Sequence, residues 1–223
     1  MTEQPIYLKQ LELGPMQNFI YLIGDPQTRE AAVVDPGWDV PQILRAAEQD
    51  GYRLTKAFVT HHHFDHVMGL AELLKVIDLP IYVHRDDARL LEVAPSSLKP
   101  VSGGETIQIG QVPVTLIHTP GHTEGSQCLL VNPAPWGGVN GRLLSGDTLF
   151  IRACGRCDLP GGDPAKLYES LTHKLKTLDE NTVLCPGHNY ADQLTSTIGD
   201  EKRTNPFLRM PTLQEFLHLV GMG

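Results

Sequence analysis

The segment Thr60-His61-His62-His63-Phe64-Asp65-His66 concentrates nitrogen and carboxylate donors directly after an apolar run. His61 and His63 are two residues apart, so in an extended or loop backbone their imidazoles leave on the same side and can bind one ion. Asp65 and His66 can then bind a second ion next to the first. Four such donors would crowd a single ion, whereas two divalent ions a few ångströms apart would use them all. The spacing therefore predicts a dinuclear metal centre.

Three later segments can supply the remaining ligands, because each follows a short β-rich run and ends in a Pro or Gly before its donor. They are Thr119-Pro120-Gly121-His122, Ser145-Gly146-Asp147-Thr148 and Cys185-Pro186-Gly187-His188. Folds of the α/β class expose functional groups beyond strand ends in this way. We therefore expect seven donors on a common rim: His61, His63, Asp65, His66, His122, Asp147 and His188.

In this order, the motifs resemble those of the metallo-β-lactamase-fold hydrolase superfamily, over about residues 18–209. The resemblance implies an α/β chain, α+β by some schemes, folded as a four-layer αββα sandwich. It would form one domain over residues 1–223, with a short C-terminal tail over 189–223. The implied ligands are His61, His63 and His122 for the first metal, Asp65, His66 and His188 for the second, and Asp147 as the bridge.

Other histidines and the cysteines are interpreted as structural. His62 occupies the variable position of the motif and is expected to point away from the metals. The remaining histidines lack a motif and are expected in structural or surface roles: His84, His118, His173 and His218. Cys154 and Cys157 form a C-x-x-C pair without a second such pair or a thioredoxin-like strand-to-helix context, so we interpret them as incidental.

Length and composition are those of an ordinary globular domain. The 223 residues are 41% hydrophobic and 20% charged, which suits one well-buried domain. A formal charge of -8, without a Lys/Arg-rich stretch, argues against nucleic-acid substrates. The N-terminus lacks the pattern of a secretory signal, and no apolar run approaches the length of a membrane span. We therefore expect a cytoplasmic, unprocessed protein.

Hydrophobic periodicity and turn residues predict alternating strands and helices. Strands are expected at 18–23, 31–34, 56–60, 80–84, 105–109, 112–117, 128–131, 142–144 and 182–184, the first two forming a sheet edge. Helices are expected at 40–49, capped by Asp39, and at 67–76, 85–93 and 214–220. A further helix begins at Asp163-Pro164 and carries an apolar ridge of Leu167, Leu171, Leu175 and Leu178. The connector 132–141 is expected to be a surface loop.

Thioester hydrolysis is the reaction that this donor set suits best. Two metals lower the pKa of a shared water towards neutrality and polarise a carbonyl, and Asp65 would orient that water. A thiolate, with a conjugate-acid pKa of about 8.5, leaves without a proton donor, whereas an amine would require a general acid. The resemblance also demotes β-lactam hydrolysis, because the β-lactamases proper lack an aspartate at the position of Asp147. The expected cofactors are two divalent ions, with zinc favoured over iron or manganese.

Within the superfamily, the chain resembles the glyoxalase II (hydroxyacylglutathione hydrolase) group through its Gly-Asp-Thr, His-Asn-Tyr and Asn-Pro segments. The resemblance implies that Arg156, Tyr190 and Arg209 contact a glutathione-linked substrate. Physically, two guanidiniums suit a ligand that carries two carboxylates. The chain departs from that group in its shorter C-terminal region and in Cys157 and Asp158, which replace aromatic residues.

A persulfide dioxygenase is the main rival interpretation, since that family shares the C-G-R-x-D run and the Asn-Pro segment. It implies one Fe(II) bound by His61, His122 and Asp147, a two-histidine, one-carboxylate triad. We favour hydrolysis because a single iron site would leave the other four donors without a role. These donors are His63, Asp65, His66 and His188. A lactonase ranks lower. A binding protein without turnover also ranks lower, because such a protein would be expected to lack some of the seven donors, and all seven are present in this sequence.

Overall fold

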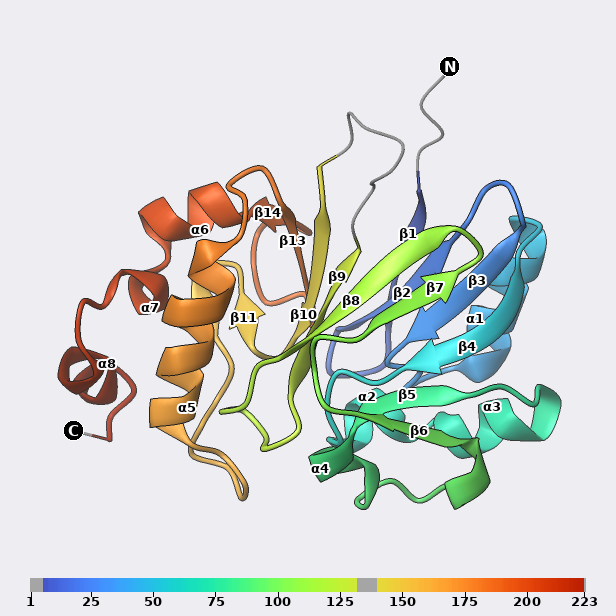
Figure 1. Cartoon of the computed structure of the whole chain (residues 1–223), viewed down its shortest axis with the longest axis horizontal. Helices are drawn as coiled ribbons and strands as arrows, with labels where there is room; N and C mark the ends of the chain where they lie inside the picture. The colour runs from blue at the N-terminus through green and yellow to red at the C-terminus, as the bar shows by residue number, and fades with distance from the viewer. Residues whose placement is uncertain (1–5, 132–139, 223) are drawn as a thin grey trace.

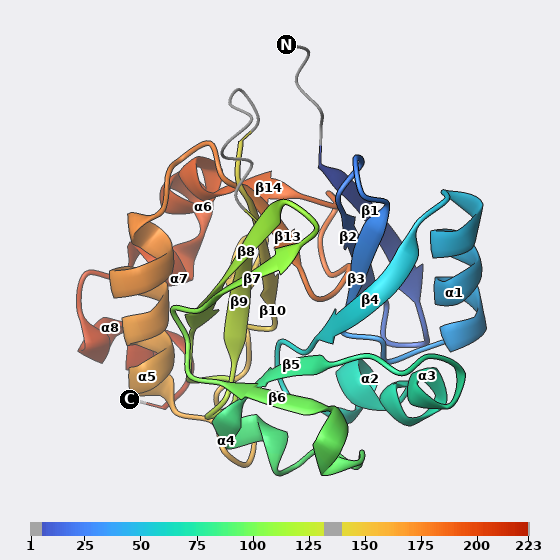
Figure 2. The same ribbon diagram turned by 45° about the vertical axis from the view of Figure 1, so that its right-hand side comes forward.

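Two six-stranded β-sheets pack face to face, and helices cover the outer face of each (Figures 1 and 2). The computed structural model describes residues 6–131 and 140–222. The first sheet has the order β1 (Tyr7–Leu13), β2 (Asn18–Gly24), β3 (Glu30–Val34), β4 (Arg53–Phe58), β5 (Ile81–His84) and β6 (Leu98–Val101). The second has the order β14 (Ser196–Thr197), β13 (Val183–Pro186), β10 (Arg142–Gly146), β9 (Gln127–Val131), β8 (Val112–His118) and β7 (Thr106–Ile109).

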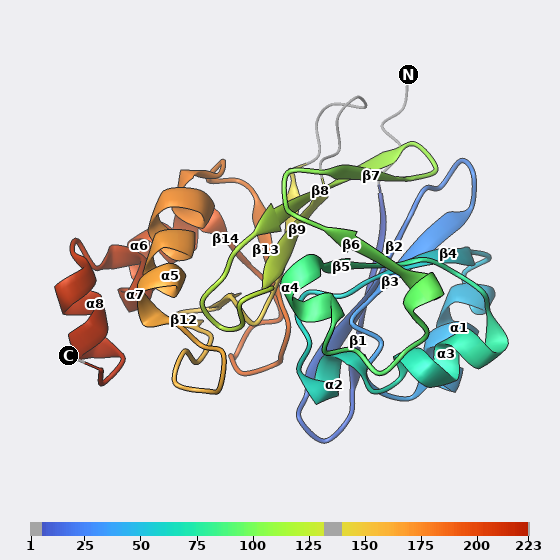
Figure 3. The same cartoon turned by 60° about the horizontal axis from the view of Figure 1, so that its bottom comes forward.

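The helices fall into two groups on opposite sides of the sheets (Figure 3). The first sheet carries α1 (Val40–Gln49), α2 (Phe64–Val67), α3 (Leu70–Val76) and α4 (Arg85–Ala88). The second is covered by α5 (Pro164–Glu169), α6 (Ile198–Thr204), α7 (Pro206–Arg209) and α8 (Leu213–Leu219). A small ribbon of β11 (Leu149–Phe150) and β12 (Ala153–Cys154) lies beside β10. This arrangement is the predicted αββα sandwich.

Strand alternation explains the layers. On β2, Phe19, Tyr21 and Ile23 belong to the apolar cluster that both sheets share. Ile20 and Leu22, between them in sequence, belong to the cluster under α1 and α3. Successive side chains of a strand point to opposite faces, so a strand that is apolar at every position must be covered on both faces. A third apolar cluster joins the second sheet to α5 and α8, which confirms the leucine ridge as core.

Several elements differ from their predicted bounds. The edge of the first sheet is β1, which the sequence did not predict, so β2 is internal. The helix expected at 67–76 begins three residues later, as α3, and a separate short helix, α2, precedes it. The two are separated at Gly69, where a Cβ would lie 2.2 Å from the Pro36 carbonyl oxygen. The helix expected at 85–93 ends at Ala88. Most of the predicted loop at 132–141 lies outside the described residues.

The carboxyl ends of five strands meet at one edge of the sandwich. β3 and β4 run parallel in the first sheet, and β10 and β13 run parallel in the second. β8 points the same way as β10, because both pair antiparallel with β9. The loops after these strands therefore emerge side by side. Within the described residues, no helix is long and apolar enough to cross a membrane.

Candidate metal centre

The predicted ligands come together as two clusters of three donors at this edge. One cluster is His61, His63 and His122, and the other is Asp65, His66 and His188. Within each cluster, one donor atom from each residue lies within 4.8 Å of the others. The loops after β4 and β8 supply the first cluster, whereas α2 and the loop after β13 supply the second. Both clusters therefore draw ligands from both sheets.

Asp147 lies between the two clusters. Its Oδ2 is 3.7 Å from Nε2 of His122 in the first cluster and 3.3 Å from Nε2 of His188 in the second. Its Oδ1 is 3.4 Å from Nε2 of His66, and no hydrogen bond from residues 6–131 or 140–222 satisfies this buried oxygen. A carboxylate with contacts on both sides can bridge two cations.

Two of the imidazoles, those of His188 and His122, are oriented by a backbone carbonyl on the other nitrogen. His188 Nδ1 donates to the carbonyl of Met16 at 2.9 Å, and His122 Nδ1 donates to the carbonyl of Arg156 at 2.7 Å. These bonds leave Nε2 as a lone-pair donor that faces the centre. Metal-ligating histidines are held in this way, because the second nitrogen fixes the tautomer and the ring orientation.

Asp35 sets the tautomers of two further imidazoles. Its Oδ2 faces Nδ1 of His66 at 3.0 Å and accepts the Thr60 hydroxyl at 2.6 Å. Because the Thr60 hydroxyl donates to Asp35, it must accept from Nδ1 of His61, 3.1 Å away. His61 Nε2 is then a buried lone pair without a hydrogen-bond partner among the described residues, as expected of a metal ligand.

The histidine pKa values shift in opposite directions in the two clusters, and both shifts favour the binding of cations. Burial, followed by the neighbouring imidazoles, lowers the pKa of His63 to about 4 and that of His61 well below its usual range, so both are neutral ligands at pH 7. Burial opposes charge on His188 too, but hydrogen bonds to Asp147 and Asp65 raise its pKa to about 10. The two carboxylates thus hold positive charge between them, in the place where metal ions would displace the protons.

Glycines let the backbone approach this cluster closely. A Cβ on Gly187, in the Pro-Gly-His segment, would lie 2.5 Å from Asp147 Oδ1. A Cβ on Gly155 would lie 1.7 Å from the Asp147 carbonyl oxygen. Only glycine avoids these contacts, so the glycine before His188 is required by the position of the carboxylate.

Three buried side chains that support the site were missed by the sequence analysis. Asp35 is described above. Asn18 donates from Nδ2 to Asp65 Oδ2 at 2.9 Å and is itself held by the Trp38 indole at 2.8 Å. Asp87 joins the two histidine loops, because its carboxylate accepts the backbone N–H of His62 at 2.8 Å and the Thr123 hydroxyl at 2.9 Å. The only sequence signal was for Asp35, an aspartate directly after a strand.

Of the three substrate-binding residues that the resemblance implies, two line the cavity over the metal centre and one does not. A cavity of about 450 Å³ opens over the centre, and both Arg156 and Tyr190 line it. Tyr190 stacks on the His188 ring, with centroids 4.6 Å apart. Arg156 forms an exposed ion pair with Asp158 at 2.7 Å. Arg209 lies exposed at the end of α7 and is not among the residues that line this cavity.

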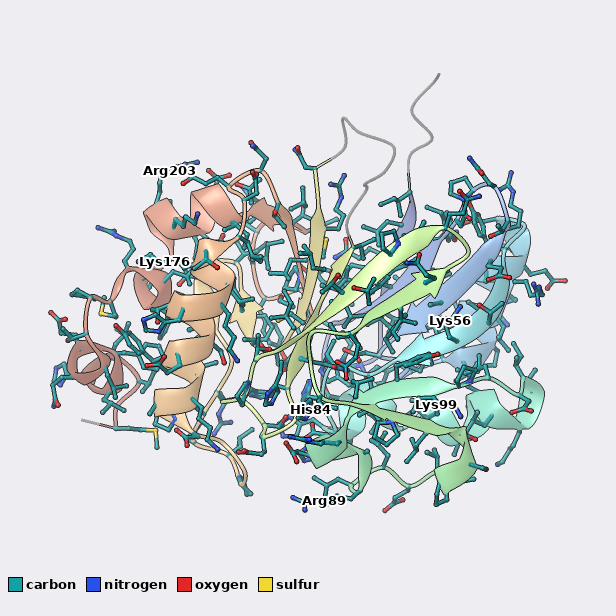
Figure 4. All side chains as sticks on the ribbon, viewed as in Figure 1. Lys56, His84, Arg89, Lys99, Lys176 and Arg203 are labelled. Carbon is teal, nitrogen blue, oxygen red and sulfur yellow. The ribbon has the colours of Figure 1, made fainter. Side chains whose placement is uncertain are left out.

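The remaining histidines lie outside the two clusters. His62 Nδ1 faces away towards Asp87 Oδ2, 2.9 Å distant, as predicted for the variable position. His84 stacks on His118 with ring centroids 3.8 Å apart, in the lower middle part of the molecule in Figure 4. Cys154 and Cys157 are free thiols, and burial raises the pKa of both. Neither is therefore poised as a thiolate.

Comparison with known proteins agrees with this geometry. A model of the metallo-beta-lactamase superfamily matches residues 13–188, which include all seven donors. The chain belongs to the metallo-β-lactamase superfamily. The buried His/Asp clusters and this membership together support a metal-dependent enzyme.

Two named members of the superfamily and one solved structure are similar to most of this chain. The human mitochondrial persulfide dioxygenase ETHE1 is 31% identical over 97% of this chain and 81% of its own length. The hydroxyacylglutathione hydrolase of Nitrosococcus oceani is 36% identical over 79% of this chain and 64% of its own length. The crystal structure of ETHE1 from Myxococcus xanthus superposes with a TM-score of 0.84 and 30% identity, covering 96% of this chain and 90% of that one.

Proposed function

We propose that this protein is a dinuclear metal-dependent hydrolase that acts on thioesters. The observation that carries the proposal is the pair of three-donor clusters joined by Asp147. In this proposal His61, His63 and His122 would hold one ion and Asp65, His66 and His188 would hold the other, with the Asp147 carboxylate available to both. Bound there, two divalent ions would make a shared water acidic and polarise the substrate carbonyl.

The chain's own residues then direct the reaction. The Asp65 carboxylate, fixed by Asn18 at 2.9 Å, accepts a hydrogen bond from the attacking water and orients it towards the acyl carbon. Water adds to the thioester carbonyl and the C–S bond breaks, giving a carboxylic acid and a thiol. The thiolate leaves without a general acid because its conjugate-acid pKa is about 8.5.

The Arg156 and Tyr190 side of the cavity would hold the thiol carrier. Arg156 is paired with Asp158 at the cavity rim, so a ligand carboxylate would have to replace that exposed partner. Exposed ion pairs of this kind contribute little stability, so replacing Asp158 by a ligand carboxylate would cost little free energy. A carboxylate-bearing carrier such as glutathione suits this position.

The test combines metal content with two activity measurements on the purified protein. We expect two divalent ions per chain, with zinc favoured, and hydrolysis of S-lactoylglutathione without oxygen uptake. One iron per chain, with oxygen consumption on glutathione persulfide and no thioester hydrolysis, would overturn the proposal.

A persulfide dioxygenase is the second candidate, favoured by the similarity of ETHE1 along almost the whole chain. Its implied ligands are also close together here, with the His61 and His122 ring centroids 4.8 Å apart and Asp147 3.7 Å from His122. Bound Fe(II) would supply oxygen chemistry at this triad. The same experiment separates the two candidates, because only the dioxygenase consumes oxygen.

A further inference from the structure

A second cavity, of about 300 Å³, lies beside the candidate metal centre and is lined mainly by apolar side chains. We call it the apolar groove. Its lining residues are His62, Phe64, Val67, Met68, Leu70, Ala71, Leu90, Leu91, Glu92 and Val93. They come from the loop before α2, from α2 and the residue after it, from the start of α3, and from the turn that follows α4, beside Arg89 at the lower edge of Figure 4.

Three large apolar side chains at this groove are exposed to solvent. Phe64 is 60% exposed, Met68 54% and Leu90 52%. Single exposed apolar residues are normal, but a group of them around one concavity marks a binding surface. The turn at Leu90 exists because α4 stops at Ala88 rather than continuing as the sequence predicted.

Phe64 lies between the groove and the metal centre. This residue stands between His63 and Asp65 in the histidine motif, and its ring lines both the apolar groove and the cavity over the metals. A ligand whose reacting carbon lies over the clusters can therefore extend past Phe64 into the groove. The carrier side of the centre, with Arg156 and Tyr190, is a separate part of the cavity lining.

The charges of the groove exclude an anionic occupant. The lining includes no lysine or arginine, and its only carboxylate, Glu92, is exposed and would repel another. His62 is turned towards Asp87, 2.9 Å away. The groove therefore suits a hydrocarbon, and a volume of about 300 Å³ lies at the lower end of small-molecule pockets.

We infer that the substrates are thioesters of unbranched medium-chain acids, with the alkyl chain of the acyl group in the apolar groove. This inference rests on the proposed thioester hydrolysis and names its substrate class. Each methylene that enters the groove should raise kcat/KM about fourfold, since burial of one methylene contributes about 0.8 kcal/mol.

The test is a series of N-acetylcysteamine thioesters with acetyl, butanoyl, hexanoyl and octanoyl groups, hydrolysed by the metal-loaded enzyme. We expect kcat/KM to rise by about two orders of magnitude from butanoyl to octanoyl. Leu90→Asp and Met68→Asp should each remove most of this rise and leave acetyl hydrolysis unchanged. Val76→Asp is the matched control, because Val76 is 64% exposed on α3 but does not line the groove.

A flat chain-length profile, or a rise that persists in both groove variants, would overturn the inference. If no thioester of any length is hydrolysed, the proposed function fails instead. The groove is then judged by calorimetric binding of octyl and methyl thioethers of N-acetylcysteamine. Tighter binding of the octyl compound that Leu90→Asp abolishes supports the groove, and equal binding of the two compounds contradicts it.

Discussion

At the scale of single residues, the proposed reaction requires Asp65 both to hold the second metal and to orient the attacking water. It belongs to the second cluster, and its Oδ2 is held by Asn18 rather than left free to rotate. Asp65→Ala should reduce kcat by more than the 10–100-fold typical of an outer partner of a metal ligand. Turnover, metal content and circular dichroism of the variant test this, and wild-type turnover in a correctly folded variant would exclude the role of Asp65 in the reaction.

Asp35 is the residue best suited to test how the metal-ligating histidines are oriented. It contacts His66 directly and orients His61 through Thr60. Asp35→Asn keeps the shape but removes the charge, and we expect metal affinity to fall about 10–100-fold. Competition with a chelator measures this. Asp25→Asn is the matched control, since Asp25 is equally buried but accepts its hydrogen bonds from its own turn and from Gln111 of another hairpin, away from the donors. Equal metal affinity in the two variants would contradict the assignment.

The sequence could predict the seven donors, and not their partners, for a physical reason. The donors stand in short motifs whose residue types are themselves the chemistry. Asn18 and Asp87, by contrast, are brought to the centre only by folding. Asn18 is separated from its contact Asp65 by 47 positions in the sequence, and Asp87 from its contact His62 by 25. Neither carries a local pattern that separates it from an ordinary polar residue.

At the scale of elements, the loop after β13 must pass close to Asp147. Gly187→Ala would place a Cβ 2.5 Å from Asp147 Oδ1 and about as close as contact allows to the Gly146 backbone, 3.0 Å away. We expect this change to displace the bridging carboxylate and to lower both metal affinity and turnover at least about tenfold. Titration with zinc and steady-state kinetics measure these losses.

Gly141→Ala is the control for that substitution. At Gly141 the nearest atom would be 3.6 Å from the new Cβ, an ordinary contact, and this glycine precedes β10 at the end far from the metals. Activity should remain at the wild-type level. If both variants behaved alike, close packing at Gly187 would have no part in holding Asp147.

Elements with strong periodicity were predicted well, and those decided by tertiary contacts were not. α1 matches its predicted bounds, because Val40, Ile43 and Ala47 form a buried stripe, Asp39 caps the first turn and Gly51 adopts a positive φ after the last. β1 was missed because only Leu13 of its seven residues is buried. The break between α2 and α3 depends on the Pro36 carbonyl, which the local sequence does not contain.

At the scale of the whole molecule, the metal centre joins the two sheets. His61, His63, Asp65 and His66 follow β4 of the first sheet, whereas His122, Asp147 and His188 follow strands of the second. The His63 and His122 nitrogens are 2.9 Å apart and those of His66 and His188 are 3.1 Å apart, so the contacts between the sheets here are between donors. Ions bound at these positions would cross-link the two halves of the sandwich.

Metal removal should therefore destabilise the whole fold and not only the active site. An ion at 100 times its dissociation constant stabilises the native state by about 2.7 kcal/mol, which for a chain of this size raises Tm by about 5 to 10 °C. Calorimetry with zinc and with a chelator measures the difference. His188→Gln should show a smaller shift because it removes a ligand of the second sheet, whereas His173→Gln, at an exposed ion pair with Glu169, should match the wild type. Stoichiometric metal binding without any shift in Tm would show that the ions do not connect the sheets.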